Sequence, residues 1–264
     1  MALTMMVRIL ILQVWRLHVL HLMLVEYRRK LKLIYLIWRH LYLIAVHKEE
    51  VAANQKERKM KGKLLQSIKN YFEALDTSVI STDRREVLQV LIDFAKSKLE
   101  KEETIILNYV CTHNSRRSQI SQIMGQVASY YYGINAICYS GGTEATAFHP
   151  NAIAAISRTG IEVEQQGESN PVIFVRYSLK RSPLSCFSKV YDHAYNMAGD
   201  FAAIMTCAHA DDNCPIILNA TRIPVRYEDP KRSDGTQEMS VVYDATVNEI
   251  AAEMKYVFQK IGNE

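Results

Sequence analysis

The sequence predicts an α/β fold with a three-layer αβα arrangement around a mainly parallel, four-stranded sheet. Short apolar runs rich in β-forming residues alternate along the chain with amphipathic segments of helical period. The chain has 264 residues, of which 48% are hydrophobic and 23% charged, so it holds enough apolar material for a sizeable core. This composition excludes collagen-like, coiled-coil and fully disordered chains.

The first sixty residues differ in composition from the rest. They carry 11 Lys+Arg against 4 Asp+Glu, a net charge of +7, whereas residues 61–264 carry 21 against 24, a net charge of −3. Residues 9–25 form a largely apolar run of 17 residues with Arg16 near its middle. A membrane-spanning helix needs about 20 such residues, and no signal-peptide cleavage site is visible.

Three interpretations of residues 1–60 stay open. In the first interpretation, these residues are a non-native leader, and the working protein starts near Met60, as the sharp change in composition there suggests. Alternatively they form a membrane-surface or signal-anchor helix, which would confine any membrane contact to residues 1–46. The third interpretation is a partner-binding helix. Because the remainder of the chain is slightly acidic, we expect no nucleic acid partner.

The cysteines indicate a cytoplasmic protein with reduced thiols. They are too few and too widely spaced for a disulfide scaffold. No CxxC pair and no His/Cys cluster has the spacing of zinc ligands, so we expect no metal site. The five are Cys111, Cys138, Cys186, Cys207 and Cys214.

Residues 61–103 are predicted to form a helical extension ahead of an α/β domain at 104–264. Its helices are expected at 63–75 and at 84–99, the second capped by Asp83. The second helix gathers its apolar residues on one face. That face consists of Val87, Leu88, Leu91, Ile92, Ala95 and Leu99.

Strands and helices then alternate through the α/β domain. A candidate fifth strand at 221–227 contains Pro224, which favours a sheet edge. Gly133 is expected to end the first helix of the domain, and Pro150 to begin the second. Ligands of such sheets bind at the carboxyl ends of strands where the strand order reverses. The strands are expected at 104–110, 135–140, 172–178 and 201–207, and the helices at 118–132, 150–159 and 238–261.

That rule directs attention to residues 111–118, Cys-Thr-His-Asn-Ser-Arg-Arg-Ser, which join the first core strand to a helix. A tight loop there can turn its backbone N–H groups toward one point at the positive end of a helix dipole, forming an anion cradle. Arg117 can hold two oxygens of an oxyanion, and the same charge stabilises a Cys111 thiolate as a nucleophile. Ser118 can donate a hydrogen bond to that sulfur. The alternative is a buried core cysteine followed by a basic, solvated loop. The predicted oxyanion-binding residues are Thr112, His113, Asn114, Ser115, Arg116 and Arg117.

This loop resembles the phosphate-binding loop of the low-molecular-weight protein tyrosine phosphatase superfamily, and within it the thioredoxin-coupled arsenate reductases. The similarity runs from about Ile105 to Ile261. It includes YSGGTEATAFHPNAIAAISRTGI (139–161), MTCAHADDNCP (205–215) and YEDP (227–230). The resemblance implies that family's fold and no bound cofactor. Residues 61–103 and about 170–192 have no counterpart in the minimal family domain.

Two further thiols bear on the activity. On an unbroken helix, the seven residues from Cys207 to Cys214 rise about 10.5 Å. A disulfide needs α-carbons within about 7 Å, so a bond between these cysteines requires the segment to unwind. On spacing alone, two reduced cysteines near a cleft remain the alternative. The resemblance implies a relay in which Cys111 attacks arsenate, Cys207 attacks Cys111, Cys214 takes over the disulfide, and thioredoxin or a similar dithiol donor resets the enzyme.

The resemblance also implies that Asp229, before Pro230, is the general acid; alone, it would be a turn residue. The sequence departs from the family at Arg116, where Cys is usual, and at His113, where Gly is usual. Arg116 is expected either to strengthen anion capture or to face solvent. Lys231 and Arg232 replace the aromatic pair that often follows Asp-Pro in the phosphatases.

The expected function is therefore arsenate reduction. The alternative is a phosphatase that hydrolyses phosphotyrosine or small phosphate esters through a phosphocysteine. A third hypothesis is a non-catalytic oxyanion or redox sensor.

Overall fold

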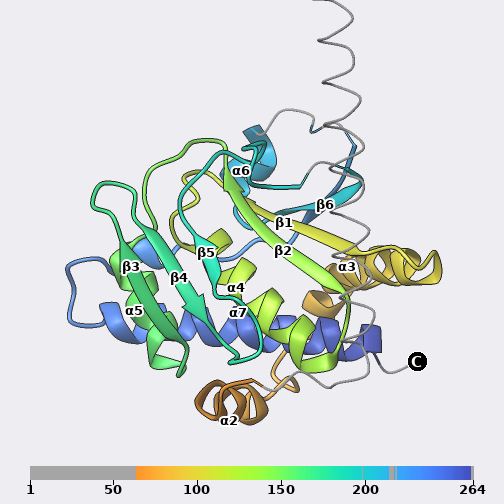
Figure 1. The fold of residues 1–264 in the computed structure, drawn as a ribbon, viewed down its shortest axis with the longest axis horizontal. Helices are drawn as coiled ribbons and strands as arrows, with labels where there is room; N and C mark the ends of the chain where they lie inside the picture. Colours follow the sequence, from red (N-terminus) through yellow and green to blue (C-terminus); the bar gives the residue numbers. More distant parts are fainter. Residues whose placement is uncertain (1–63, 198, 214–216, 218, 263–264) are drawn as a thin grey trace, which may run out of the picture. The chain divides into compact units, whose positions relative to one another are not determined.

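A parallel sheet of four strands lies at the centre of the computed structural model, which describes residues 64–262 apart from 198, 214–216 and 218 (Figure 1). The strand order is β2-β1-β6-β7, and every neighbouring pair is parallel. β1 is buried along its whole length, as expected for a parallel strand covered on both faces. The strands are β1 (Ile105–Cys111), β2 (Ala136–Gly142), β6 (Phe201–Met205) and β7 (Ala220–Pro224).

The prediction for 172–178 is wrong in one respect, because this strand does not belong to the parallel sheet. It forms β4 (Val172–Arg176), which pairs antiparallel with β3 (Glu162–Gln166) and β5 (Leu184–Cys186). β3 was not predicted because four of its five residues are polar and exposed. The fourth strand of the parallel sheet is instead β7, the candidate edge strand, and it does lie at the edge.

The predicted helices are confirmed, and two short helices are added, one α-helix and one 3₁₀ helix. Ser81, and not Asp83, caps α3, because its hydroxyl accepts the Arg84 N–H at 3.2 Å. Gly133 ends α4 in the left-handed conformation, with φ of 68°. The helix α6 was not predicted. The helices are α2 (Gln66–Ala74), α3 (Thr82–Glu100), α4 (Arg117–Tyr132), α5 (Pro150–Arg158), α6 (Ala208–Asn213), the 3₁₀ helix η1 (Pro230–Ser233) and α7 (Met239–Gly262).

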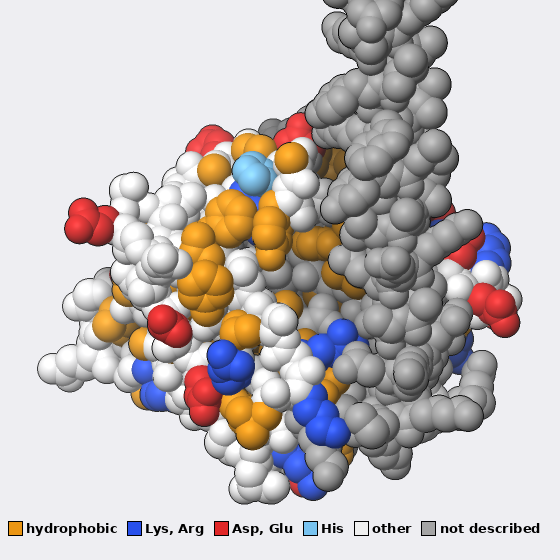
Figure 2. Space-filling model, in the orientation of Figure 1, with side chains coloured by type: hydrophobic (Ala, Val, Ile, Leu, Met, Phe, Trp, Pro, Cys, Tyr) orange, Lys and Arg blue, Asp and Glu red, His pale blue; other side chains and the backbone are white. Residues whose placement is uncertain are grey.

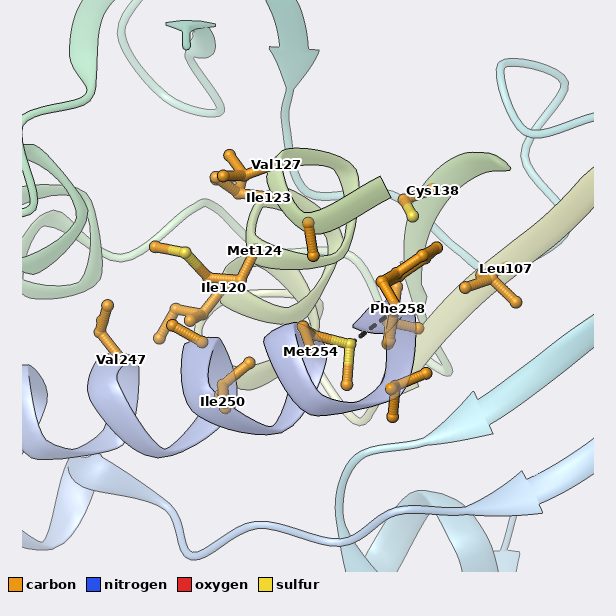
Figure 3. Packing of buried hydrophobic residues seen from close by; sticks show 14 of the residues in the cluster. Leu107, Ile120, Ile123, Met124, Val127, Cys138, Val247, Ile250, Met254 and Phe258 are labelled. Atoms are coloured by element: carbon orange, nitrogen blue, oxygen red, sulfur yellow. Dashed lines mark hydrogen bonds between the residues drawn. The ribbon is translucent and has the colours of Figure 1, made fainter. Parts of the chain in front are cut away.

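One face of the parallel sheet and most of the helices share a single hydrophobic core. Leu107 and Tyr109 point from β1 into it, together with buried residues of α2, α3, α4, α5 and α7. Figure 3 shows side chains of α4, including Met124, packing between that helix and Ile250 and Met254 of α7. The helices of the 61–103 extension are thus part of the same core as the α/β domain.

The alternate residues of the strands point to the opposite face. There, Ile106, Val110 and Met205 pack with Ala210 of α6. Figure 2 shows hydrophobic side chains gathered at the surface over β2 and β5. The ring centroids of Phe187 and Tyr195 lie 5.3 Å apart. Helices thus pack on both faces of the four-stranded parallel sheet, which confirms the predicted αβα class.

The strand order places one loop at the point where the direction of the crossovers reverses. β1 lies between β2 and β6, so the loop that leaves its carboxyl end runs between the ends of both neighbours. This is the loop predicted to bind an oxyanion. Among the helices of the described part of the chain, none combines the length and apolarity needed to cross a membrane. Residues 1–60 and Cys214 lie outside the described residues.

Candidate active site

The loop between β1 and α4 presents a row of backbone N–H groups. Within the described chain, none of the five N–H groups of residues 112–116 donates a hydrogen bond to a protein acceptor. Asn114, with φ of 47°, takes the left-handed conformation that Asn tolerates well. α4 begins directly after the loop and adds the positive end of its dipole. Unpaired N–H groups beside a helix N-terminus form an anion-binding arrangement.

Asn114 fixes the shape of the loop from inside. Its side chain is buried, and its Oδ1 accepts hydrogen bonds from the Lys189 N–H at 3.0 Å and from Gln119 Nε2 at 3.1 Å. Its Nδ2 donates to Ser118 Oγ at 2.9 Å, and Ser118 Oγ lies 3.0 Å from Cys111 Sγ. Because Ser118 Oγ accepts from Asn114, its own proton is available to the Cys111 sulfur.

The backbone at the end of β2 packs directly against the backbone of the loop. Thr143 N–H donates to Cys111 O at 3.1 Å, and Glu144 N–H donates to Thr112 O at 2.8 Å. A Cβ atom added at Gly142 would lie 2.3 Å from Glu144 O and 2.6 Å from Thr112 O. Only glycine fits this position without displacing the loop.

The outer side of the loop is tied to the segments that surround it. Ser188 Oγ donates to His113 O at 2.9 Å, and Ser115 Oγ donates to Ala147 O at 2.6 Å. The His113 imidazole is half exposed and lies 3.5 Å from the Glu144 carboxylate. The His113 side chain thus lies on the solvent rim, whereas its carbonyl is part of the braced loop.

Arg117 and Asp229, 112 positions apart in the sequence, are in direct contact. Arg117 Nη2 donates to Asp229 Oδ2 at 2.6 Å, and Nη1 donates to Tyr227 O at 2.9 Å. Asp229 caps η1 by accepting the Lys231 N–H at 3.1 Å. The carboxyl group expected to act as the acid therefore lies at the oxyanion loop.

The Arg116 side chain takes neither of the two roles expected for it. Its Nε donates to Tyr243 OH at 2.8 Å, and its Nη2 donates to Asp234 Oδ2 at 3.1 Å. The side chain is only 12% exposed. The guanidinium is thus directed toward α7 and the segment after η1, and the backbone N–H is the part of Arg116 that remains with the loop.

Cys207 follows β6 and lies beside the loop. It belongs to the same buried cluster as Cys111. Thr112 Oγ1 lies 3.6 Å from Cys207 Sγ and 3.2 Å from His209 Nδ1. The Ala210 N–H donates to the Cys207 sulfur at 3.3 Å. Cys214, the third thiol of the predicted relay, is outside the described residues.

Cys138 and Cys186 lie in the core, in keeping with a structural role. Burial raises the pKa of Cys186 to about 12 and lifts the pKa of Cys138 well above its usual range. Neither is a ready nucleophile. In the described ranges, no group of three or more His, Cys, Asp and Glu side chains is arranged to hold a metal ion.

Sequence reasoning missed several residues that shape the site. Ser188 and Lys189 come from the stretch without a family counterpart, and no local pattern marks them. Asp234 could have been considered as a partner of Arg116, because an arginine that becomes buried needs a carboxylate nearby. His209 lies two residues after Cys207, so the spacing alone could have placed it near the loop.

Sequence comparison finds similarity to arsenate reductases. No protein-family model matches the chain. The chain is 28% identical over 134 residues to an arsenate reductase of Halalkalibacterium halodurans, covering 50% of this chain and 79% of that protein. It is 28% identical over 152 residues to an arsenate reductase of Shouchella clausii, covering 57% and 92%. Among solved structures, a thioredoxin-dependent arsenate reductase of Corynebacterium glutamicum is 20% identical with a TM-score of 0.34, covering 66% and 70%. The sequence similarities confirm the resemblance to arsenate reductases.

Proposed function

We propose that the protein is a cytoplasmic arsenate reductase in which Cys111, Cys207 and Cys214 form a thiol relay. The observation that carries the proposal is a second thiol in the same buried cluster as the first. Cys207 shares a buried cluster with Cys111, and Thr112 Oγ1 lies within 3.6 Å of its sulfur. Hydrolysis of a phosphate ester requires no second thiol at this place. The sequence similarity to arsenate reductases supports the same activity.

The first step uses the oxyanion loop. The N–H groups of residues 112–116 and the Arg117 guanidinium hold arsenate, and the Cys111 thiolate forms a bond to arsenic. An As–O bond breaks, and Asp229 gives the departing oxygen a proton. Arsenate competes with Asp229 for Arg117.

The second step reduces arsenic. The Cys207 thiolate attacks the Cys111 sulfur, so that an S–S bond forms while the S–As bond breaks. The electron pair of the S–As bond stays on arsenic, which leaves as arsenite. Cys214 then attacks Cys207, which frees Cys111 and leaves a disulfide between Cys207 and Cys214. Thioredoxin or a similar dithiol donor reduces that disulfide.

A disulfide between Cys207 and Cys214 is expected to require a local change in α6, which spans the sequence between them. This helix, Ala208–Asn213, separates the two cysteines. A seven-residue helical separation is about 10.5 Å, beyond the roughly 7 Å that a disulfide allows. Asp211 of α6 accepts hydrogen bonds from Arg222 Nε at 3.1 Å and from Arg226 Nε at 2.8 Å. We therefore expect unwinding of α6 to break these ion pairs.

The test compares arsenate reduction, driven by thioredoxin, with hydrolysis of an aryl phosphate. We expect Cys207→Ser to abolish arsenate reduction and to keep ester hydrolysis, and Cys111→Ser to abolish both. Cys186→Ser serves as the matched control, because Cys186 is a buried thiol in a different cluster from Cys111 and Cys207, and it should behave like the wild type. Undiminished arsenate reduction by Cys207→Ser would rule out the relay.

A second candidate function is hydrolysis of phosphotyrosine or small phosphate esters. The contact between Arg117 and Asp229 beside Cys111 favours it, because these three groups suffice for phosphocysteine chemistry. Ester hydrolysis without arsenate reduction in the wild type would establish this function. If the wild type shows neither activity, the non-catalytic oxyanion or redox sensor becomes the better description.

A further inference from the structure

The segment that carries Asp229 is held at its other end by a second carboxylate. Asp234 directly follows η1 (Pro230–Ser233). Its Oδ2 accepts from Arg116 Nη2 at 3.1 Å, and its Oδ1 accepts from Tyr243 OH at 2.8 Å. Asn151 Nδ2 donates to Oδ1 at 3.3 Å. Residues from the oxyanion loop, α5 and α7 therefore meet at one carboxylate.

The charge of this carboxylate is stabilised by its partners. Burial opposes the charge of Asp234, but the Tyr243 hydrogen bond and the Arg116 guanidinium outweigh it and keep the Asp234 pKa below its usual value. His149 Nε2 lies 3.8 Å from Asp234 Oδ2. Burial and Arg116 lower the pKa of His149, so this imidazole is neutral at pH 7 and leaves Arg116 as the cation of the cluster.

Two consecutive arginines of the oxyanion loop thus hold the two ends of the acid segment. Arg117 holds Asp229, and Arg116 holds Asp234. In the proposed mechanism, the first contact opens because the oxyanion replaces Asp229 on Arg117. The second contact does not involve the anion-binding groups, so it can persist while the first is open. Without it, the end of the segment that follows Asp229 would lose its attachment to the loop at the moment the acid is needed.

We propose that Arg116 is a positioning residue that keeps Asp229 over the bound oxyanion by holding Asp234. The proposal rests on the proposed function, in which Asp229 protonates the departing oxygen. The Arg116 side chain, which donates to Tyr243 and Asp234, touches neither the oxyanion nor the reacting sulfur. Its loss should therefore remove the contribution of the acid and leave anion binding and nucleophilic attack in place.

The test uses a series of aryl phosphates with different leaving groups. Dinitrophenolate leaves without a proton, whereas phenolate needs one. We expect Arg116→Gln to slow hydrolysis of phenyl phosphate about 10- to 100-fold and that of 2,4-dinitrophenyl phosphate less than threefold. In an Asp229→Asn background, Arg116→Gln should have no further effect. Arg158→Gln is the matched control, since Arg158 pairs with Asp244 between the same two helices, α5 and α7, away from the loop.

Hydrogen exchange of the backbone amides of residues 227–236 provides a readout that needs no activity. We expect Arg116→Gln and Asp234→Asn to speed this exchange more than tenfold relative to Arg158→Gln, with unchanged exchange in the core of α4. An unchanged leaving-group dependence together with unchanged exchange would overturn the positioning role while the proposed function stands. A wild type inactive toward both arsenate and aryl phosphates would overturn the proposed function, and the exchange result would still decide whether Arg116 holds the segment.

Discussion

Replacing Gly142 by alanine should impair the oxyanion loop although Gly142 belongs to the neighbouring strand. The added Cβ would lie 2.3 Å from Glu144 O, 2.6 Å from Thr112 O and 2.8 Å from Asn114 N. All three atoms are backbone atoms, so no side chain can rotate away. The separation at Glu144 has to grow by about 0.7 Å or more before the contact reaches the shortest distances that real Cβ atoms show.

This displacement falls on the groups that define the anion site. Thr112 and Asn114 each contribute an N–H to the loop. The buried side chain of Asn114 leaves the loop little room to adjust. Misplacing a reacting group by about 1 Å can lower a rate about 100-fold. We therefore expect Gly142→Ala to lower kcat/KM about 100-fold for aryl phosphate hydrolysis and for arsenate reduction, and to weaken binding of inorganic phosphate.

Gly141→Ala is the control that separates loop damage from general damage to β2. Its Cβ would meet Tyr191 Cα at 2.3 Å, an equally tight contact that faces the segment after β5 and not the loop. Steady-state kinetics, phosphate titration and thermal melting of both variants would be compared. If Gly142→Ala keeps activity within threefold of the wild type, the argument that the loop has no room for a Cβ is refuted.

Two other predictions concern ionisation in the core. Burial lowers the pKa of Lys189 to about 8, a shift from its ordinary value of 10.5 that corresponds to about 3 kcal/mol. Its charge therefore opposes folding fully below pH 8 and progressively less up to pH 10.5. Lys189→Met should raise the free energy of unfolding by up to about 3 kcal/mol at pH 7, and this gain should shrink toward pH 10; a pH-independent difference in urea unfolding would contradict this. Iodoacetamide at pH 8 should leave Cys138 and Cys186 unmodified in the native protein, because burial raises the pKa of both thiols; mass spectrometry that finds either residue alkylated as fast as in the unfolded chain would count against it.

The centre of the site could be predicted because it is local in sequence. Cys111 ends a buried apolar strand, and Ser118 lies one residue into the following helix, so their spacing sets a loop at the carboxyl end of the strand. Asn114 suits a left-handed residue within that loop. These features depend on neighbouring residues, and periodicity and turn chemistry report such features directly.

The parts that could not be predicted depend on contacts between distant segments. The polar strand β3 is held by pairing with β4, which the residues of β3 do not encode through hydrophobic alternation. Both Ser81 and Asp83 are suitable caps for α3, and the choice between them depends on where the first turn begins. Asp234, the partner of Arg116, lies 118 positions away, and only the packing of α7 against α4 brings its segment to the loop.

The contacts around the oxyanion loop are of two kinds. Some hold the loop in a fixed shape, and one can be exchanged when an anion binds. Asn114, Ser188 and Gly142 fix the loop through buried hydrogen bonds and close backbone packing, and none of these contacts has to change during a turnover. The bond between Arg117 and Asp229, by contrast, is an ion pair at the partly exposed edge of the site, and an incoming anion can replace it. In the proposed mechanism, substrate binding can therefore release the Asp229 carboxyl from Arg117 without loosening the hydrogen bonds that hold the loop.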